Sequence, residues 1–156
     1  MPDFSIEKKF YQNVIGIDEV GRGALTGPVV SCAFIFYEKH LDKEGFKIID
    51  DSKKLSLKKR LNAYKKIKEL KRLKKIDYKL GIASVEEIDN FNILEATKIS
   101  MIRAVKKLKL PPTPLIVDGN IDLKLRDYPS NSIIQGDRKS LTIAAASILA
   151  KIHRDR

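Results

Sequence analysis

Four acidic residues stand where apolar segments give way to polar turns. Asp18 and Glu19 are adjacent at the end of one such segment, Asp118 ends a second, and Asp137 follows a third. Carboxylates that are gathered in one place repel one another, and cations between them relieve that repulsion. Mg²⁺ takes oxygen ligands and often borrows further oxygens from a phosphate substrate. The pattern therefore favours phosphodiester chemistry with two metal ions.

Each acid taken alone has a simpler interpretation. An Asp after a strand is commonly a turn former or a helix cap. The recurrence at three strand ends weakens that interpretation. It does not by itself separate a nuclease from a phosphatase or a polymerase.

The chain is strongly basic. Its 156 residues include 31 Lys and Arg against 20 Asp and Glu, for a formal net charge of +11. This excess favours a polyanionic partner, with nucleic acid first, although a lysine-rich soluble surface is the alternative. No apolar stretch approaches membrane-spanning length, so we expect a cytoplasmic protein with no membrane partner. Cys32 lies in an apolar run and is expected to be a small core residue, whereas His40 and His153 are expected at the surface.

Five strands and three helical stretches must position the acids. Apolar, β-branched and aromatic runs predict strands at residues 13–20, 28–37, 77–85, 114–119 and 131–137. Helical spacing predicts helices at residues 56–75, 85–110 and 140–156, with a polar loop at 38–54. This order predicts an α/β fold with a mixed sheet and helices on its faces.

Two of the predicted helices have an apolar stripe that is expected to face the core. The helix at 56–75 has Ser56 as a predicted N-cap, and its polar face is either solvated or turned toward phosphates. Its apolar stripe consists of Leu57, Leu61, Tyr64, Ile67, Leu70 and Leu73. On the helix at 85–110, the stripe is Leu94, Met101, Val105 and Leu108.

Adjacent strand residues point to opposite faces, so Asp18 and Glu19 are expected to share a site only if the strand ends there and Glu19 turns into the loop.

The segments around the acids resemble ribonuclease HII. "GIDEVGRGALTGPVV" is similar to the family's opening pattern, although Val20 replaces the usual Ala. Four later blocks follow in the family's order: "DSKKLS", "FNILEATKISM", "VDGN" and "GDRKSLTIAAASILAKIHRDR". Ribonuclease HIII typically has Thr where Arg22 stands, so Arg22 favours ribonuclease HII.

The resemblance implies an RNase H-like fold, a mixed five-stranded sheet flanked by helices, with residues 1–156 as a single catalytic domain. It implies an endoribonuclease that hydrolyses the RNA strand of RNA–DNA hybrids. It also implies incision 5′ of ribonucleotides embedded in duplex DNA, as in ribonucleotide excision repair and DNA replication, with 3′-hydroxyl and 5′-phosphate products. The family's catalytic and metal-binding acids correspond to Asp18, Glu19, Asp118 and Asp137, with two Mg²⁺ or Mn²⁺ ions as cofactors.

The resemblance also points to residues that contact substrate. Gly21, Arg22 and Gly23 correspond to the family's ribose-sensing loop, in which glycine lets the backbone approach the 2′-hydroxyl and Arg22 holds a phosphate. A simple tight turn is the alternative for these glycines.

Four further residues are candidates for contact with nucleic acid. Lys53, Lys54 and Lys139 are candidates for phosphate contacts. Asn92 matches a polar family position near the nucleic acid, with a capping role as the alternative. Asp155 resembles a family position that supports a helix end.

The chain ends within the last predicted helix. Family members normally continue for several dozen residues, which include a tyrosine that stacks on the sugar at the RNA–DNA junction. No residue here matches that tyrosine. The alternatives are therefore a catalytically weakened hybrid-binding module, a ribonuclease HIII-like enzyme, or another RNase H-like nuclease such as an integrase or resolvase. No obligate protein partner is expected.

Overall fold

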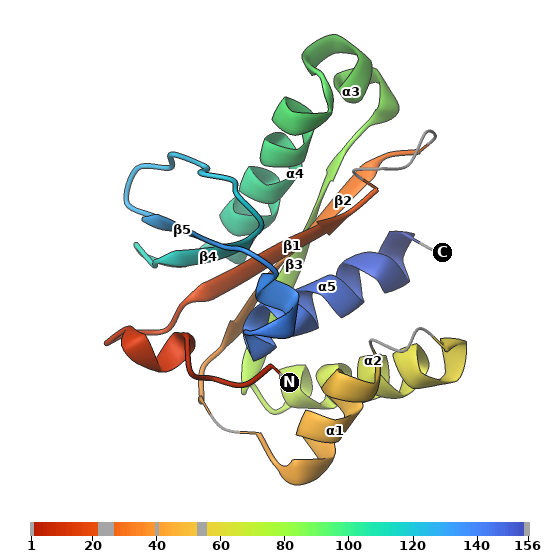
Figure 1. Cartoon of the computed structure of the whole chain (residues 1–156), viewed down its shortest axis with the longest axis vertical. Coiled ribbons are helices and arrows are strands. Elements are labelled where there is room, and N and C mark those ends of the chain that lie inside the picture. Colours follow the sequence, from red (N-terminus) through yellow and green to blue (C-terminus); the bar gives the residue numbers. More distant parts are fainter. Residues whose placement is uncertain (1, 22–26, 40, 53–55, 155–156) are drawn as a thin grey trace.

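A mixed five-stranded sheet forms the centre of the molecule (Figure 1). The computed structural model describes residues 2–21, 27–39, 41–52 and 56–154. The strands are β1 (Ile15–Val20), β2 (Val29–Phe36), β3 (Ile76–Ala83), β4 (Leu115–Asp118) and β5 (Ser130–Ile133). They lie in the order β3-β2-β1-β4-β5, with β1, β4 and β5 parallel and β2 antiparallel to both β1 and β3. The predicted α/β class and the five strands are confirmed.

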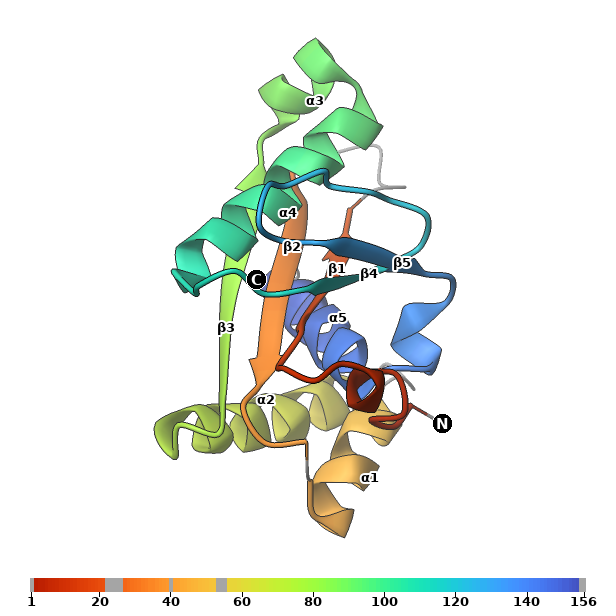
Figure 2. The same ribbon diagram turned by 90° about the vertical axis from the view of Figure 1, so that its left-hand side faces the viewer.

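Helices cover both faces of this sheet (Figure 2). The helices are α1 (Lys43–Ser52), α2 (Leu57–Arg72), α3 (Val85–Phe91), α4 (Ile93–Leu108) and α5 (Leu141–Arg154), with short 3₁₀ turns η1 (Glu7–Lys9) and η2 (Gly136–Arg138). The helix α4 packs on one face, and α5 packs on the other with α1 and α2 beside it. No helix in the described part of the chain is both long and apolar enough to cross a membrane.

Side chains alternate along β1, and this alternation determines which face of the sheet each residue points to. Ile15 and Ile17 belong to the core under α4. Gly16 faces α5, where an added Cβ would lie 2.7 Å from Cγ2 of Thr142. The backbone of α5 is therefore seated directly on β1, and Asp18 faces the same side as Gly16.

Two predicted boundaries were wrong. The expected polar loop contains α1, because Asp42 Oδ1 accepts the Gly45 N–H at 2.6 Å and Ile49 gives the turn a buried side chain. The stretch predicted as one helix at 85–110 is divided into α3 and α4 at Asn92, whose φ is +74°. A positive φ cannot continue an α-helix, so the chain changes direction there.

The apolar stripe predicted for α2 is only partly correct. Ile67 and Leu70 are buried, whereas Leu57 is 70% exposed and Leu61 and Leu73 are also exposed. Ser56 is the N-cap as predicted, since its side chain accepts the Lys59 N–H. The helix α2 therefore contacts the core along a short central segment.

Three other expectations have clear outcomes. On α4, Met101, Val105 and Leu108 are buried as expected, but Leu94 is exposed. Cys32 is fully buried in β2 and is confirmed as a core residue. His153 is exposed, and His40 lies outside the described residues.

Candidate active site

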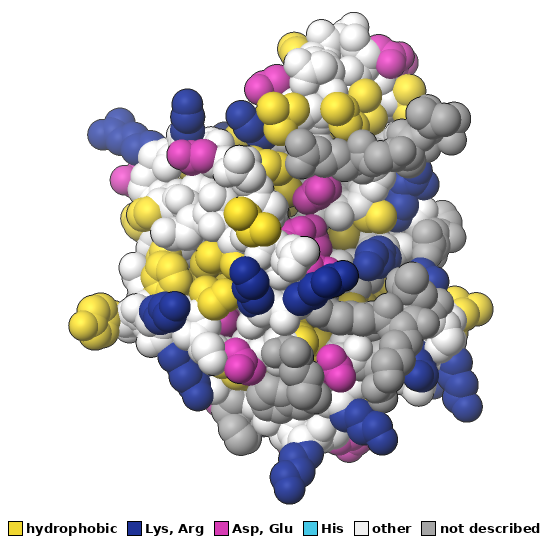
Figure 3. All heavy atoms as spheres, viewed as in Figure 1, with side chains coloured by type: hydrophobic (Ala, Val, Ile, Leu, Met, Phe, Trp, Pro, Cys, Tyr) yellow, Lys and Arg dark blue, Asp and Glu magenta, His cyan; other side chains and the backbone are white. Residues whose placement is uncertain are grey.

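Two of the four acids lie side by side because β1 and β4 are parallel. Ile17 pairs with Val117 in this register, and Asp18 and Asp118 follow at the next position of each strand. Asp137 does not end β5 as expected but lies in η2, and its N–H points to Oδ1 of Asp118 at 3.4 Å. On the face of the molecule shown in Figure 3, acidic side chains lie near the centre, with Lys and Arg side chains around them.

The electrostatics of the acids reflect this crowding. Asp18 is 5% exposed, and burial raises its pKa well above the usual value, with further contributions from the charges of Asp118 and Glu19. Burial and the charge of Asp137 likewise raise the pKa of Asp118. Such a group of carboxylates has the chemistry of a site for hard cations.

Glu19 comes from the other face of β1. The strand continues to Val20, and Glu19 lies opposite Ser31 on β2. The condition for a shared site, that the strand ends at this pair, is therefore not met, because pairing with β2 holds Glu19 in extended backbone. Side chains alternate along a strand, so Glu19 lies on the face covered by α4 while Asp18 faces α5.

The carboxylates are not arranged as a complete set of ligands for a metal ion. Within the described ranges, no group of three or more His, Cys, Asp or Glu side chains is arranged to hold a metal ion.

The chain leaves β1 through a glycine that no other residue could replace without strain. Gly21 has φ +103°, and an added Cβ would lie 2.7 Å from the carbonyl oxygen of Pro28. Across the connection, a Cβ on Gly27 would lie 2.7 Å from Nη2 of Arg154. The end of α5 therefore packs against both ends of this connection. Arg22 and Gly23 lie outside the described residues.

Of the other predicted contact residues, the structure describes Lys139 and Asn92. Lys139 is exposed two residues after Asp137. Asn92 is a cap, since its Oδ1 accepts the Glu95 N–H at 3.0 Å, and it is exposed at the junction of α3 and α4. Lys53, Lys54 and Asp155 lie outside the described residues.

Three residues near the site were missed from the sequence. Ser147 on α5 hydrogen-bonds Asp18, Arg154 borders the β1–β2 connection, and Glu7 is buried against the start of α5. A lone serine within the apolar run "AAASILA" was a usable signal for the first. Nothing local in the sequence marks Glu7, because its partners lie more than a hundred residues away.

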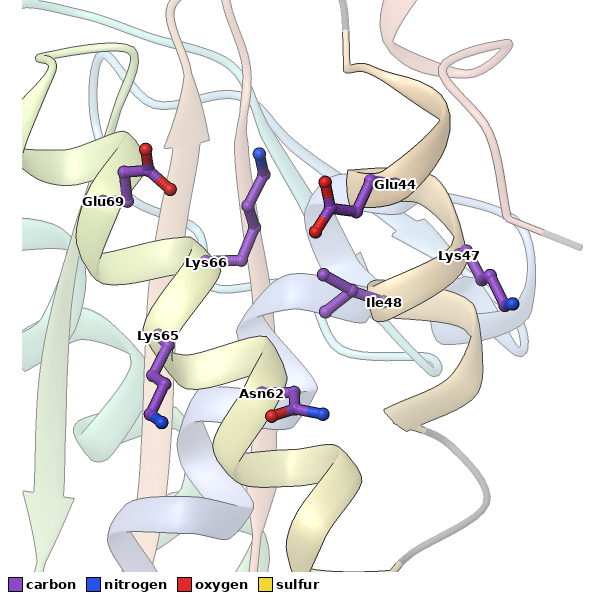
Figure 4. Close-up of a pocket in the computed structure, with 7 residues that line it drawn as sticks. All are labelled: Glu44, Lys47, Ile48, Asn62, Lys65, Lys66 and Glu69. Atoms are coloured by element: carbon purple, nitrogen blue, oxygen red, sulfur yellow. The ribbon is translucent and has the colours of Figure 1, made fainter.

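A cavity of about 510 Å³ lies elsewhere, between α1 and α2 (Figure 4). Its lining residues are Glu44, Lys47, Ile48, Asn62, Lys65, Lys66 and Glu69. The three lysines are partly balanced by two glutamates, and none of the four acids lines it. This cavity is therefore separate from the candidate active site.

The comparison with known families agrees with the acidic site. A sequence model described as Ribonuclease HII matches residues 15–156. The chain belongs to the ribonuclease HII family. Its class is accordingly ribonuclease H, an endonuclease, as the resemblance implied.

Two ribonuclease HII relatives show the extent of the match. The chain is 46% identical to the protein from Wolbachia pipientis subsp. Culex pipiens over 155 residues, which are 99% of this chain and 74% of that protein. It is 50% identical to the protein from Staphylococcus saprophyticus over 145 residues, which are 92% of this chain and 52% of that protein. The chain thus spans only about half the length of the second relative.

Solved ribonuclease HII structures share the fold. Ribonuclease H2 from Pyrococcus horikoshii OT3 superposes with a TM-score of 0.76 at 27% identity, covering 93% of this chain and 73% of that one. RNase HII from Archaeoglobus fulgidus, solved as a complex with PCNA, has a TM-score of 0.72 at 26% identity, covering 92% of this chain and 73% of that one. The RNase H-like fold is confirmed. The expectation that this chain has no obligate protein partner stays a prediction.

Proposed function

We propose that this chain is a metal-dependent endoribonuclease that hydrolyses the RNA strand of RNA–DNA hybrids and cuts 5′ of ribonucleotides embedded in duplex DNA. The products are a 3′-hydroxyl and a 5′-phosphate. Family membership supports activity on hybrids. One observation supports the site above all: the parallel pairing of β1 and β4 sets Asp18 beside Asp118, and the loop that carries Asp137 is bound to Asp118.

Asp18, Glu19, Asp118 and Asp137 would hold two divalent cations, Mg²⁺ or Mn²⁺. The donor set fits, because carboxylate oxygens are the ligands these hard ions prefer. Burial and repulsion together raise the pKa of Asp18 and Asp118, and a divalent cation would relieve the repulsion. Because no three of the side chains yet surround one point, they would have to turn inward to share an ion.

The chain's own residues determine how the acids are held. Asp18 is the most buried of the four and receives a hydrogen bond from Ser147, so it is the candidate for the ligand shared by both ions. The main chain of η2 binds Asp118 and so orients that carboxylate. Glu19 would reach the ions only if its backbone left the extended conformation that pairing with β2 imposes. When bound, the ions would lower the pKa of the attacking water and stabilise the departing 3′ oxygen.

Recognition of the ribonucleotide is assigned to the β1–β2 connection. Gly21 has no side chain and a positive φ, and it is only partly buried, so a sugar could approach its backbone from the exposed side. Arg22 and Gly23 would complete the ribose-sensing loop. Lys139 would contact a phosphate beside Asp137, with Lys53, Lys54 and Asn92 as further contacts. Contacts to phosphates give affinity without reading sequence.

One cleavage assay tests this proposal. The protein is incubated with a DNA duplex that carries one ribonucleotide, in Mg²⁺, Mn²⁺ or EDTA, beside a long RNA–DNA hybrid and an all-DNA junction. The expected result is a metal-dependent nick 5′ of the ribonucleotide and cleavage of the RNA strand of the hybrid. Cutting of the all-DNA junction would instead indicate a resolvase-like enzyme, and binding without a nick would indicate a hybrid-binding module.

A further inference from the structure

The chain before β1 forms a strap across the start of α5. We call residues 3–10 the N-terminal strap. The Asp3 N–H donates to the Lys139 carbonyl oxygen at 3.3 Å, and the Leu141 N–H donates to the Asp3 carbonyl oxygen at 2.9 Å. Ile6 and Phe10 pack beside Ile143 of α5. The strap is therefore hydrogen-bonded to Lys139, which lies between Asp137 and α5, and to Leu141, the first residue of α5.

Glu7 is the polar centre of the N-terminal strap. It is 2% exposed, and its Oε2 accepts the Thr142 Oγ1 hydroxyl at 2.6 Å, the Ser140 Oγ hydroxyl at 3.0 Å and the Thr142 N–H at 3.1 Å. No Lys or Arg in the described part of the chain forms an ion pair with it. A carboxylate is favoured at this place because the first N–H groups of a helix lack partners within the helix.

These contacts connect Glu7 to the acidic site. On one side of the η2 loop, the main chain of Asp137 binds Asp118. On the other side, the Ser140 N–H donates to the Gly136 carbonyl oxygen at 2.8 Å, and the Ser140 hydroxyl donates to Glu7. The loop that carries Asp137 is thus fixed at both ends, by Asp118 and by Glu7.

We propose that Glu7 is a positioning residue that holds the η2 loop, and with it Asp137, in the geometry that binds the divalent cations. This role rests on the proposed function, which assigns Asp137 as a metal ligand. Glu7 lies outside residues 15–156, so the family match does not assign it. Isolated burial of a carboxylate is costly, and the hydrogen bonds that Ser140 and Thr142 donate to Oε2 offset part of that cost, whereas the buried Oε1 has no hydrogen-bond partner among the described residues.

The first test measures Mn²⁺ binding to the metal-free protein by calorimetry, in wild type and Glu7→Gln. The substitution keeps the shape of the side chain and removes its charge. We expect the Mn²⁺ dissociation constant to rise by roughly 10- to 100-fold, as is typical when a residue that supports a metal ligand is lost. In cleavage assays at saturating Mn²⁺, the KM for the hybrid is expected to stay at the wild-type value.

A matched control separates positioning from general loss of stability. Val105 is buried in α4, in the core on the other face of the sheet, and that core includes no residue of the strap or η2, so Val105→Thr or Val105→Ala is chosen to match the fall in Tm of Glu7→Gln. Mn²⁺ affinity is expected to stay at the wild-type value in this control. If Glu7→Gln binds Mn²⁺ no more weakly than the control of equal Tm, the role of Glu7 is overturned.

A second pair of variants approaches the same contact from α5. Thr142→Val removes the hydroxyl that donates to Glu7 and keeps the shape of the side chain, whereas Thr142→Ser keeps the hydroxyl. We expect Val to weaken Mn²⁺ binding and Ser to preserve it, and we expect Glu7→Gln to add little to Thr142→Val. Equal affinities of the Val and Ser variants would overturn the role. A wild type that neither binds Mn²⁺ nor cuts hybrid would overturn the proposed function as well, whereas normal binding by both wild type and Glu7→Gln overturns the role of Glu7 alone.

Discussion

Asp18 and Asp118 occupy matching positions on two parallel strands, each one residue beyond the paired residues Ile17 and Val117. Neighbouring strands lie about 4.8 Å apart, so the backbone itself brings the two carboxylates together. Burial raises the pKa of both, and each is raised further by a neighbouring acid. The acids cannot separate without breaking the pairing of β1 with β4.

Replacing Asp18 with Asn tests this crowding. Asp18→Asn is expected to lower the cleavage rate at least about 1,000-fold, equivalent to roughly 4 kcal/mol of transition-state stabilisation, and to leave hybrid binding intact. The metal-free variant is expected to melt several degrees above wild type, because a buried charge facing other acids has been removed. Cleavage assays, hybrid binding and melting in EDTA measure these effects, with the exposed Asp122→Asn as a control that changes none of them. Cleavage by Asp18→Asn at the wild-type rate would refute the metal assignment.

The contact between Gly16 and Thr142 gives a second prediction. A Cβ at Gly16 would also lie 2.9 Å from the carbonyl carbon of Thr142, so Gly16→Ala must push α5 away from β1. We expect a loss of roughly 1–3 kcal/mol in the free energy of unfolding and weaker Mn²⁺ binding, since α5 carries Ser147. Gly81→Ala is the comparison: it meets the backbone of α4 on the other face and is expected to destabilise the fold with a smaller effect on Mn²⁺ affinity. Equal effects of the two variants on Mn²⁺ affinity would argue against this coupling.

Lys139 is tested by the salt dependence of binding. If it contacts a phosphate, Lys139→Ala reduces the slope of log affinity for hybrid against log salt concentration by about 1. Fluorescence anisotropy over a series of salt concentrations measures the slope. Lys106 is exposed on α4, and Lys106→Ala is expected to leave the slope unchanged. A slope for Lys139→Ala equal to that of wild type would remove Lys139 from the interface.

Asn92 has a capping role in the structure and a proposed role in binding, and Asn92→Asp separates them. Asp caps helices about as well as Asn and also tolerates a positive φ, so the free energy of unfolding should change by less than about 0.5 kcal/mol. A carboxylate near phosphates would nevertheless weaken hybrid binding. Denaturant unfolding and hybrid titration measure the two effects. Unchanged hybrid affinity would leave Asn92 as a cap only.

Glu87 predicts a specific dependence of stability on pH. Hydrogen bonds from Arg103 and Ser84 lower its pKa from 4.5 to about 2. A lowered pKa stabilises the folded state above pH 4.5, and this contribution is lost as the pH falls through about 2. Glu87→Gln should therefore be less stable than wild type at neutral pH, with the difference shrinking between pH 4.5 and 2. Urea unfolding over this range measures it, and the exposed neighbour Glu86→Gln should show a difference that is small at every pH.

The sequence predicted the parts of this molecule that depend on local patterns. Apolar runs located all five strands, and the acids followed from their positions after those runs. The break at Asn92 was missed because helical spacing continues across it, and only its positive φ interrupts the helix. The extended backbone at Glu19 depends on pairing with β2, which no local pattern reports. Glu7 was missed for the same reason, since Ser140 is 133 residues away along the chain.

The parallel pairing of β1 with β4 has a consequence for folding. Asp118 follows Asp18 by 100 residues, and no hairpin can bring two parallel strands together. The loss of chain entropy on closing so long a loop must be met before this pairing contributes any stability, so contacts of this kind form slowly. Chains in which only the β1–β2 and β2–β3 pairs have formed contain Asp18 and Glu19 but no cluster of acids. Under the proposed metal assignment, recovery of divalent-cation binding during refolding therefore reports formation of this long-range pairing.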